Sequence, residues 1–214
     1  MASFVITGCF RGPGPALAWE LASPPLWVKA LSGRVEPVML DFTDQTSIEN
    51  AVVMAEGNLG GKRSDVLINN AVCLPIRRRR SKVHPTIFGS IALAPAVHFL
   101  PAPSYKISKA ALHALTVWYS LDHADEGFAF IALCPSWLKT ILGGGNMADL
   151  TQEEGAKASL DILFKPNSET NGKMPKVLVK AGRPTATATM HPTFLGNLAK
   201  LLLLGGHGIC VEIN

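Results

Sequence analysis

The pattern of hydrophobic and polar positions predicts short strands that alternate with helices. Uncharged runs rich in β-branched residues predict buried strands, and apolar residues three or four positions apart predict helices. The predicted strands are residues 3–6, 35–40, 65–71, 128–133 and 176–179, and the predicted helices are residues 16–21, 46–56, 103–115 and 151–164. This alternation indicates an α/β fold with a doubly wound, mostly parallel sheet, which binds ligands at the carboxyl ends of its strands.

A glycine-rich turn joins the first predicted strand to the first predicted helix. It is the stretch Thr7-Gly8-Cys9-Phe10-Arg11-Gly12-Pro13-Gly14. In such an arrangement, backbone N–H groups and the helix N-terminus can bind a pyrophosphate, and glycines are needed because a Cβ would block the close approach. The turn alone is weak evidence for a nucleotide site.

Tyr105 and Lys109 are the candidate groups for proton transfer. They are four residues apart, so on a helix they lie on one face, one turn apart. A free tyrosine has a pKa of about 10 and is a poor acid–base catalyst at neutral pH. The ammonium of Lys109 is expected to favour the phenolate and lower the pKa of Tyr105. On its own the pattern is typical of an exposed helix, and it becomes informative beside a dinucleotide turn.

Composition predicts one compact domain. Of the 214 residues 48% are hydrophobic and 17% are charged, so we expect a single domain over residues 1–180 and an extension of unclear structure over residues 181–214. The net charge is +4, and four of the positive charges lie together at residues 77–80. No general nucleic-acid binding is therefore expected.

The remaining compositional features concern compartment, membrane and metals. The cysteines at positions 9, 73, 134 and 210 form no CxxC pair, which fits reduced thiols in the cytoplasm. No signal peptide is expected, because no basic segment or cleavage site accompanies the first apolar run. The apolar run at 195–204 is too short to span a bilayer and predicts a packed helix. The histidines show no metal-ligand spacing, so no metal site is expected.

Five motifs occur in one order along the chain. They are Thr7-Gly8-x-x-x-Gly12-x-Gly14, Asp41-x-Thr43-Asp44, Asn69-Asn70-Ala71, Tyr105-x-x-x-Lys109 and Pro135-Ser136-x-x-x-Thr140. Together they resemble the short-chain dehydrogenases/reductases, over residues 3–180. The stretch at residues 88–91 is similar to small single-domain reductases of fungal and bacterial metabolism. The resemblance implies a Rossmann-like fold and an oxidoreductase that interconverts a small carbonyl compound and an alcohol, with NADP as cofactor or NAD as the alternative.

The resemblance also implies roles for individual residues. Tyr105 would protonate the carbonyl oxygen, and Lys109 would lower the tyrosine pKa and hold the nicotinamide ribose. A hydroxyl group upstream would polarise the carbonyl; Thr86 is preferred by its local context and Ser90 is the fallback. The positions that the resemblance assigns to cofactor binding are Gly8, Arg11, Gly12, Pro13, Gly14, Asp41, Asn70, Tyr105, Lys109, Leu138 and Thr140.

The chain departs from the family pattern in three places. Pro13 replaces a residue with a free N–H, which removes one potential phosphate donor. Residues 23–40 are too few for a strand, a crossover helix and another strand, even if residues 27–31 form a strand. Residues 72–81 read as a loop where the family has a long helix that carries a relay asparagine and forms the dimer interface. One or two crossover helices are therefore expected to be missing, and the usual dimer is in doubt.

Several alternatives remain open at this stage. The arginines at 77–80 could bind an acidic cofactor group or nucleic acid, or form a solvated linker, which is the favoured interpretation. Residues 183–189 read as a flexible linker and residues 143–145 as a mobile loop. The first functional hypothesis is an active oxidoreductase. The second is a catalytically impaired relative that binds a nucleotide weakly or binds a protein partner, and the third is an imperfect translation of the gene.

Overall fold

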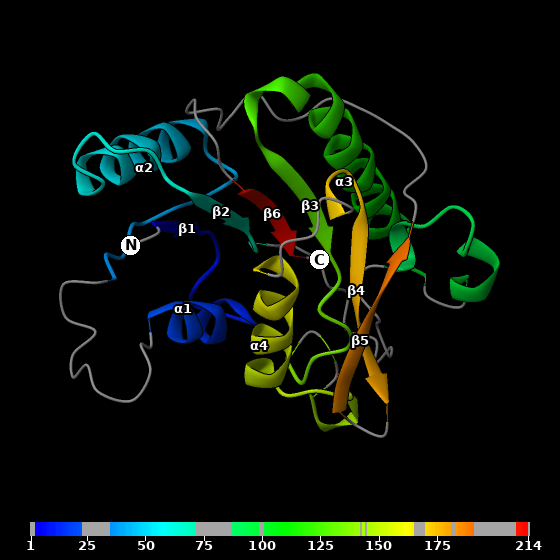
Figure 1. The fold of residues 1–214 in the computed structure, drawn as a ribbon. Coiled ribbons are helices and arrows are strands. Elements are labelled where there is room, and N and C mark those ends of the chain that lie inside the picture. Colours follow the sequence, from blue (N-terminus) through cyan, green and yellow to red (C-terminus); the bar gives the residue numbers. More distant parts are fainter. Residues whose placement is uncertain are drawn as a thin grey trace.

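The protein is built around a parallel sheet with helices on both faces (Figure 1). The structure, a computed structural model, describes residues 3–22, 35–71, 87–98, 101–141, 143, 145–164, 170–180, 183–190 and 209–213. The main sheet has four strands in the spatial order β1 (Phe4–Ile6), β2 (Val66–Asn69), β6 (Ile209–Ile213) and β3 (Ala129–Leu133). All three pairings are parallel, which confirms the predicted α/β fold.

An antiparallel hairpin continues the sheet beyond β3. It consists of β4 (Met174–Lys180) and β5 (Arg183–Met190). The backbone N–H groups of Ala132 and Cys134 donate to the carbonyls of Lys173 and Pro175, at 3.1 and 2.9 Å. The start of β4 therefore lies alongside β3, and the hairpin extends the sheet on that side.

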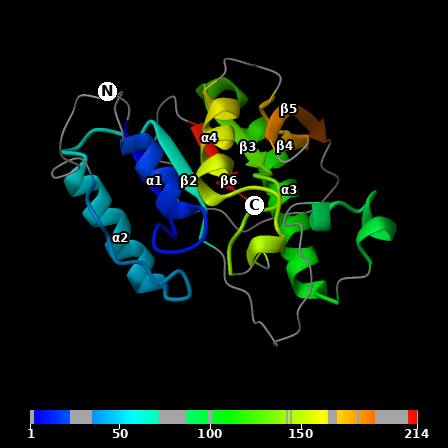
Figure 2. The same cartoon turned by 90° about the horizontal axis from the view of Figure 1, so that it is seen from below.

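The helices form two layers, one on each face of the sheet (Figures 1 and 2). The first layer is α1 (Gly14–Ala22) and α4 (Gln152–Leu163), and their apolar residues share one buried cluster with Ile68 of β2 and Leu133 of β3. The second layer is α3 (Pro103–Asp122), whose Tyr119 ring lies 5.3 Å from the ring of Phe130. Because alternate strand residues point to opposite faces, Phe130 and Leu133 face different layers.

Local sequence signals explain where two of the helices begin. Helix α2 (Gln45–Asn58) starts after Asp44, whose carboxylate accepts hydrogen bonds from the backbone N–H groups of Thr46 and Ser47. Helix α4 starts with a capping box between Thr151 and Glu154. Asp44 is thus the N-cap of α2.

Two predictions of local structure are wrong. Residues 35–40 form no strand, and the side chain of Met39 is 83% exposed. Pro37 has no N–H to donate to a ladder, and the structure places no described strand beside this segment. Residues 183–189, predicted as a linker, form most of β5. Its alternating threonines suit a strand that pairs with β4.

The structure also places part of the predicted extension in the main sheet. Residues 209–213 form β6, between β2 and β3, so the extension does not lie apart from the domain. Four predictions fall on residues outside the described part: the strand at 27–31, the loop at 72–81 with its arginines at 77–80, the hydroxyl of Thr86 and the helix at 195–204. Within the described part, no helix is both long enough and apolar enough to cross a membrane.

Candidate active site

The glycine turn between β1 and α1 fits closely against the end of β2. Gly8 has a φ of +70°, and a Cβ there would lie 2.8 Å from the Cα of Ala71. A Cβ on Gly14 would collide with the carbonyl oxygen of Gly8 and with the side-chain amide of Asn70. Both positions therefore require glycine, for the left-handed conformation at Gly8 and for space at Gly14.

Asn70 holds this turn in place. Its side-chain Nδ2 donates to the carbonyls of Thr7 and Gly8 at 3.2 and 3.1 Å. The hydroxyl oxygen of Thr7 in return accepts from the backbone N–H groups of Asn70 and Ala71, at 3.0 and 3.1 Å. The side chain of Asn70, a predicted cofactor-binding residue, thus donates its hydrogen bonds to the backbone of the glycine turn. Asn70 is 8% exposed.

The turn has the features of an anion site, with fewer donors than the sequence suggested. The first N–H groups of a helix have no intrahelical partner, and here Arg11 is exposed just before α1. Gly12, also in the turn, has a φ of +62° and open space around it. Pro13 and Pro15 both lack an N–H, and the loss at Pro15 was missed from the sequence. The turn therefore fits a phosphate group but offers it a reduced set of backbone donors.

Asp41 lies on the surface and is already hydrogen-bonded. Its Oδ1 accepts from the backbone N–H of Thr43 at 2.9 Å and from the Thr43 hydroxyl at 2.7 Å. The two hydrogen bonds lower the pKa of Asp41, the one from the Thr43 hydroxyl more than the one from the Thr43 backbone N–H. The carboxylate is therefore ionised at neutral pH and can accept further hydrogen bonds through its other oxygen.

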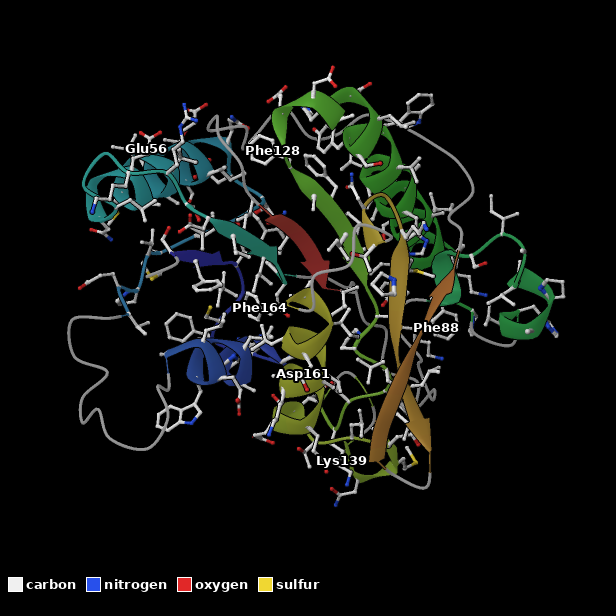
Figure 3. All side chains as sticks on the ribbon, in the orientation of Figure 1. Glu56, Phe88, Phe128, Lys139, Asp161 and Phe164 are labelled. Carbon is white, nitrogen blue, oxygen red and sulfur yellow. The ribbon has the colours of Figure 1, made fainter. Side chains whose placement is uncertain are left out.

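Tyr105 and Lys109 lie together on the buried face of α3. They are 6% and 5% exposed, and the Lys109 Nζ is 5.6 Å from the centroid of the Tyr105 ring. The short helix η1 (Ile87–Gly89) covers them, with the Phe88 ring 6.4 Å from that of Tyr105. Figure 3 labels Phe88 near the start of α3. The expected pairing of phenol and ammonium on one helix face is present.

The pKa of Tyr105 is shifted in the direction opposite to the one predicted from the sequence. Burial of the phenol is the largest cause and raises the pKa above its ordinary value of 10.0, and a charge on the nearby Cys134 thiol would raise it further. Desolvation disfavours the charged form of any acid, and no lowering of this pKa by Lys109 accompanies it. The phenol of this chain is therefore protonated at neutral pH.

His113 extends the same face by one more turn and was missed as a site residue. It is 2% exposed, and its Nε2 has no hydrogen-bond partner within the described residues. Burial, and secondly the charge of Lys109, lower its pKa from 6.5 to about 4. The imidazole is therefore neutral at neutral pH. Its spacing of four residues from Lys109 was the sequence signal that could have revealed it.

The loop after β3 carries hydrogen bonds within itself, and the mobility expected around residues 143–145 stays a prediction. The indole N–H of Trp137 donates to the carbonyl of Gly143 at 2.6 Å. The Thr140 hydroxyl oxygen accepts from the N–H of Gly143 at 2.8 Å, and the Thr140 carbonyl accepts from Gly145 at 2.9 Å. Leu138 is 5% exposed and packs against Gly155 of α4. In Figure 3 this loop carries the labelled Lys139, well away from Phe88.

Comparison with known proteins bears on the fold. No family model matches the chain. The C-signal protein of Myxococcus xanthus is 33% identical over 72 residues, which are 34% of this chain and less than half, 43%, of that protein. The crystal structure of an NADPH-bound carbonyl reductase from chicken has 22% identity and a TM-score of 0.64, covering 86% of this chain and 98% of that one. A short-chain dehydrogenase/reductase of Burkholderia multivorans with bound NADP has 20% identity and a TM-score of 0.61, covering 86% and 99%.

The chain has the short-chain dehydrogenase/reductase fold. At these identities the likeness establishes the fold, and it confirms the resemblance drawn from the five motifs. In this short-chain dehydrogenase/reductase fold, the glycine turn follows β1, Asn70 follows β2 and Cys134 follows β3. Parallel strands end at one edge of the sheet, so these groups and Tyr105 share that edge.

Two further points complete the site. Of the candidate carbonyl-polarising groups, Thr86 lies outside the described residues, and the Ser90 hydroxyl oxygen accepts from the N–H of Leu93 at 3.3 Å. Across the described ranges, no three His, Cys, Asp or Glu side chains come together to hold a metal ion.

Proposed function

We propose that the chain is an NADP-dependent oxidoreductase that interconverts a small carbonyl compound and an alcohol. The observation that carries the proposal is the buried pair on α3, with the Lys109 Nζ 5.6 Å from the Tyr105 ring. The pair lies at the sheet edge that also carries the glycine turn. The choice of NADP is supported by the bound cofactors of the chicken and Burkholderia multivorans proteins. A cytoplasmic location and the oligomeric state stay predictions.

In this proposal Tyr105 is the proton donor. Because burial raises its pKa, its phenol is protonated at neutral pH and can donate to the oxygen of a bound carbonyl group. As the oxygen takes the proton, the phenolate that remains is stabilised by the nearby ammonium of Lys109. Alcohol oxidation would run the same step in reverse, with the phenolate of Tyr105 accepting the proton of the alcohol. When bound, NADPH supplies the hydride that the carbonyl carbon receives.

The proposal assigns cofactor binding to residues of three other segments. The glycine turn with Arg11 would bind the pyrophosphate through backbone N–H groups and a guanidinium. Asp41 would accept a hydrogen bond from the adenine amino group. The backbone of Leu138 and the hydroxyl of Thr140 would bind the carboxamide; the Thr140 oxygen accepts from Gly143, so its own O–H is available to donate. Thr86 would polarise the carbonyl, with Ser90 as the alternative.

A comparison of two tyrosine variants tests the proposal. Tyr105→Phe removes the proton donor, whereas Tyr119→Phe alters a tyrosine of the same helix that packs on Phe130. Binding of NADPH and NADH would be measured by titration, and turnover by NADPH consumption with a panel of small ketones and aldehydes. We expect micromolar NADPH binding in all three proteins and a turnover loss of at least about 100-fold in Tyr105→Phe only.

Two outcomes would overturn the proposal. No binding of either nucleotide up to millimolar concentration would exclude a dinucleotide enzyme, and equal turnover in Tyr105→Phe would exclude the assigned proton donor. The second hypothesis, a catalytically impaired relative, is favoured by one specific observation, the two prolines at the start of α1. It predicts that NADPH binds weakly and that no carbonyl compound is turned over.

A further inference from the structure

Strand β6 lies in the middle of the sheet although it comes late in the sequence. It pairs with β2 through residues such as Val211 and Ile68, and with β3 through Val211 and Ile131. β2 and β3 do not pair with each other; β6 separates them throughout. Removing β6 would leave a slot two strand spacings wide, about 9.5 Å, between β2 and β3. Figure 1 shows β6 in this central position.

The two walls of this slot are held by partners other than β6. On one side β2 is bound to β1, with the N–H of Val66 donating to Ser3 and the carbonyl of Ile68 accepting from Thr7, at 3.1 and 3.0 Å. On the other side, β3 is bound to the start of β4 through residues 130, 132 and 134. Both walls therefore have supports that do not depend on β6.

The backbone hydrogen-bonding groups of each wall that do not bond to β1 or to the start of β4 point into the slot. In a parallel pair, alternate residues of a strand bond to opposite neighbours. Since Val66 and Ile68 bond to β1, the N–H and C=O groups of Leu67 and Asn69 face β6. By the same alternation, residues 129, 131 and 133 of β3 face β6 from the other side. These groups need a partner because they are covered by helices on both faces of the sheet.

Two sequence properties decide which segment can occupy the slot. An interior strand needs an N–H at every ladder position, so proline is excluded, and helices on both faces favour β-branched apolar residues. The segment Ile-Cys-Val-Glu-Ile at residues 209–213 contains no proline, and all of its residues except Glu212 are apolar. The connection from β5 is residues 191–208, and 18 residues can span up to about 60 Å. The connection is therefore long enough for the segment to reach the slot from the end of β5.

We propose that the space between β2 and β3 is a strand-acceptor site for a peptide with the sequence of residues 205–214, and that its occupation joins the two functional halves of the sheet. The nucleotide half is β1, α1, α2 and β2, and the catalytic half is β3, α3 and α4. β6 is the strand that hydrogen-bonds to both. Helices α1 and α4 contact each other across the same boundary. The ring of Phe164, which follows α4 and is labelled in Figure 3, lies 5.9 Å from the ring of Phe4 in β1, measured between centroids.

The test uses the full chain with a protease site inserted after Leu204. After cutting, the fragment from residue 205 on is no longer covalently joined to the rest of the chain, and its described contacts are its pairings with β2 and β3. We expect it to co-elute with the rest of the chain in size-exclusion chromatography. A fluorescent peptide of residues 205–214 should then exchange into the cut protein, measured by anisotropy, but should not bind the uncut protein, whose slot is filled by the tethered strand.

A matched pair of peptides tests whether the fragment is held as a strand. The Val211→Pro peptide lacks one ladder N–H and should compete at least ten-fold less well than the natural peptide. The Glu212→Gln peptide keeps the backbone unchanged and should compete equally well. Loss of the fragment on cutting, with or without unfolding of the remainder, would overturn the proposal. Equal competition by the proline peptide would also overturn it. No readout involves a nucleotide, so the result is independent of the proposed function.

Discussion

The nucleotide half and the catalytic half of the sheet differ in how far their groups are buried. In the catalytic half, Tyr105, Lys109 and His113 are each 6% exposed or less, and Leu133 is fully buried. In the nucleotide half, every residue of β1 is half-buried, and helix α2 has no buried residue. In the described part of the sheet, β1 has a neighbouring strand on one side only.

This difference matches the role that the proposed function gives to each half. Proton transfer depends on shifted pKa values, which need a dry environment where desolvation and nearby charges act strongly. Anion binding by a turn depends on the direction of backbone N–H groups, which glycines and Asn70 can fix without deep burial. The catalytic half supplies most of the core, while the nucleotide half adds residues such as Leu17 and Ile68 to it and carries the exposed helix α2.

Core truncation should show this contrast most clearly. Leu133→Ala removes a fully buried side chain between α1 and α4, and should lower the free energy of unfolding by about 2–5 kcal/mol. Met54→Ala in α2 removes a side chain that is 51% exposed, and should change it by less than about 0.5 kcal/mol. Urea unfolding followed by circular dichroism measures both. Equal effects would show that α2 is packed as tightly as the catalytic half.

The neutral His113 should make stability fall in mild acid. Its pKa is about 4 when folded and 6.5 ordinarily, so between these pH values the unfolded chain binds more protons than the folded chain. Stability is therefore lost as the pH falls from 6.5 towards 4, by up to about 3 kcal/mol. The measurement is urea unfolding at pH 7, 6, 5 and 4.

Two variants identify the residue responsible for this acid sensitivity. His113→Gln cannot titrate, so its stability should depend less on pH over this interval. His98→Gln, in an exposed histidine, should keep the slope of the natural chain. An unchanged slope in His113→Gln would assign the acid sensitivity to other groups.

The sequence predicted the elements whose signals are local. The helix caps at Asp44 and Thr151 each depend on a few neighbouring residues. The glycine turn and the Tyr105 helix are likewise continuous motifs. Such patterns specify backbone geometry directly, because the groups that satisfy each other are close in the chain. The order of these motifs also predicted the fold correctly.

The sequence did not reveal features that depend on distant partners. The position of β6 depends on edges presented by β2 and β3, far away in the chain. The raised pKa of Tyr105 depends on how much of α3 is covered by residues such as Phe88. Residues 35–40 form no strand, and within the described residues no strand lies beside them to pair with. None of these is encoded in the segment that shows it.

Replacing Ser136 tests whether the backbone of the catalytic half is strained. It has a φ of +70°, in the left-handed region that glycine adopts without strain. Ser136→Gly should raise the free energy of unfolding by about 0.5–1 kcal/mol, because the relief of strain exceeds the added chain entropy. Ser108→Gly, in the exposed part of α3, should lower it by a similar amount. Thermal unfolding of the two variants should therefore shift in opposite directions, and a destabilised Ser136→Gly would show that its hydroxyl makes a needed contact.

The smallest expected effect concerns the nucleotide half. Pro15→Ala adds one backbone N–H in the first turn of α1, beside the glycine turn. If this N–H reaches the pyrophosphate, NADPH affinity should rise about 2- to 10-fold, the equivalent of one ordinary hydrogen bond. Pro95→Ala, at an exposed position of η2 (Ala94–Val97), frees the unfolded chain in the same way and should leave affinity unchanged. An unchanged affinity in Pro15→Ala would mean that the phosphate lies closer to Gly8 and Arg11 than to the helix, and that the nucleotide half binds through its turn alone.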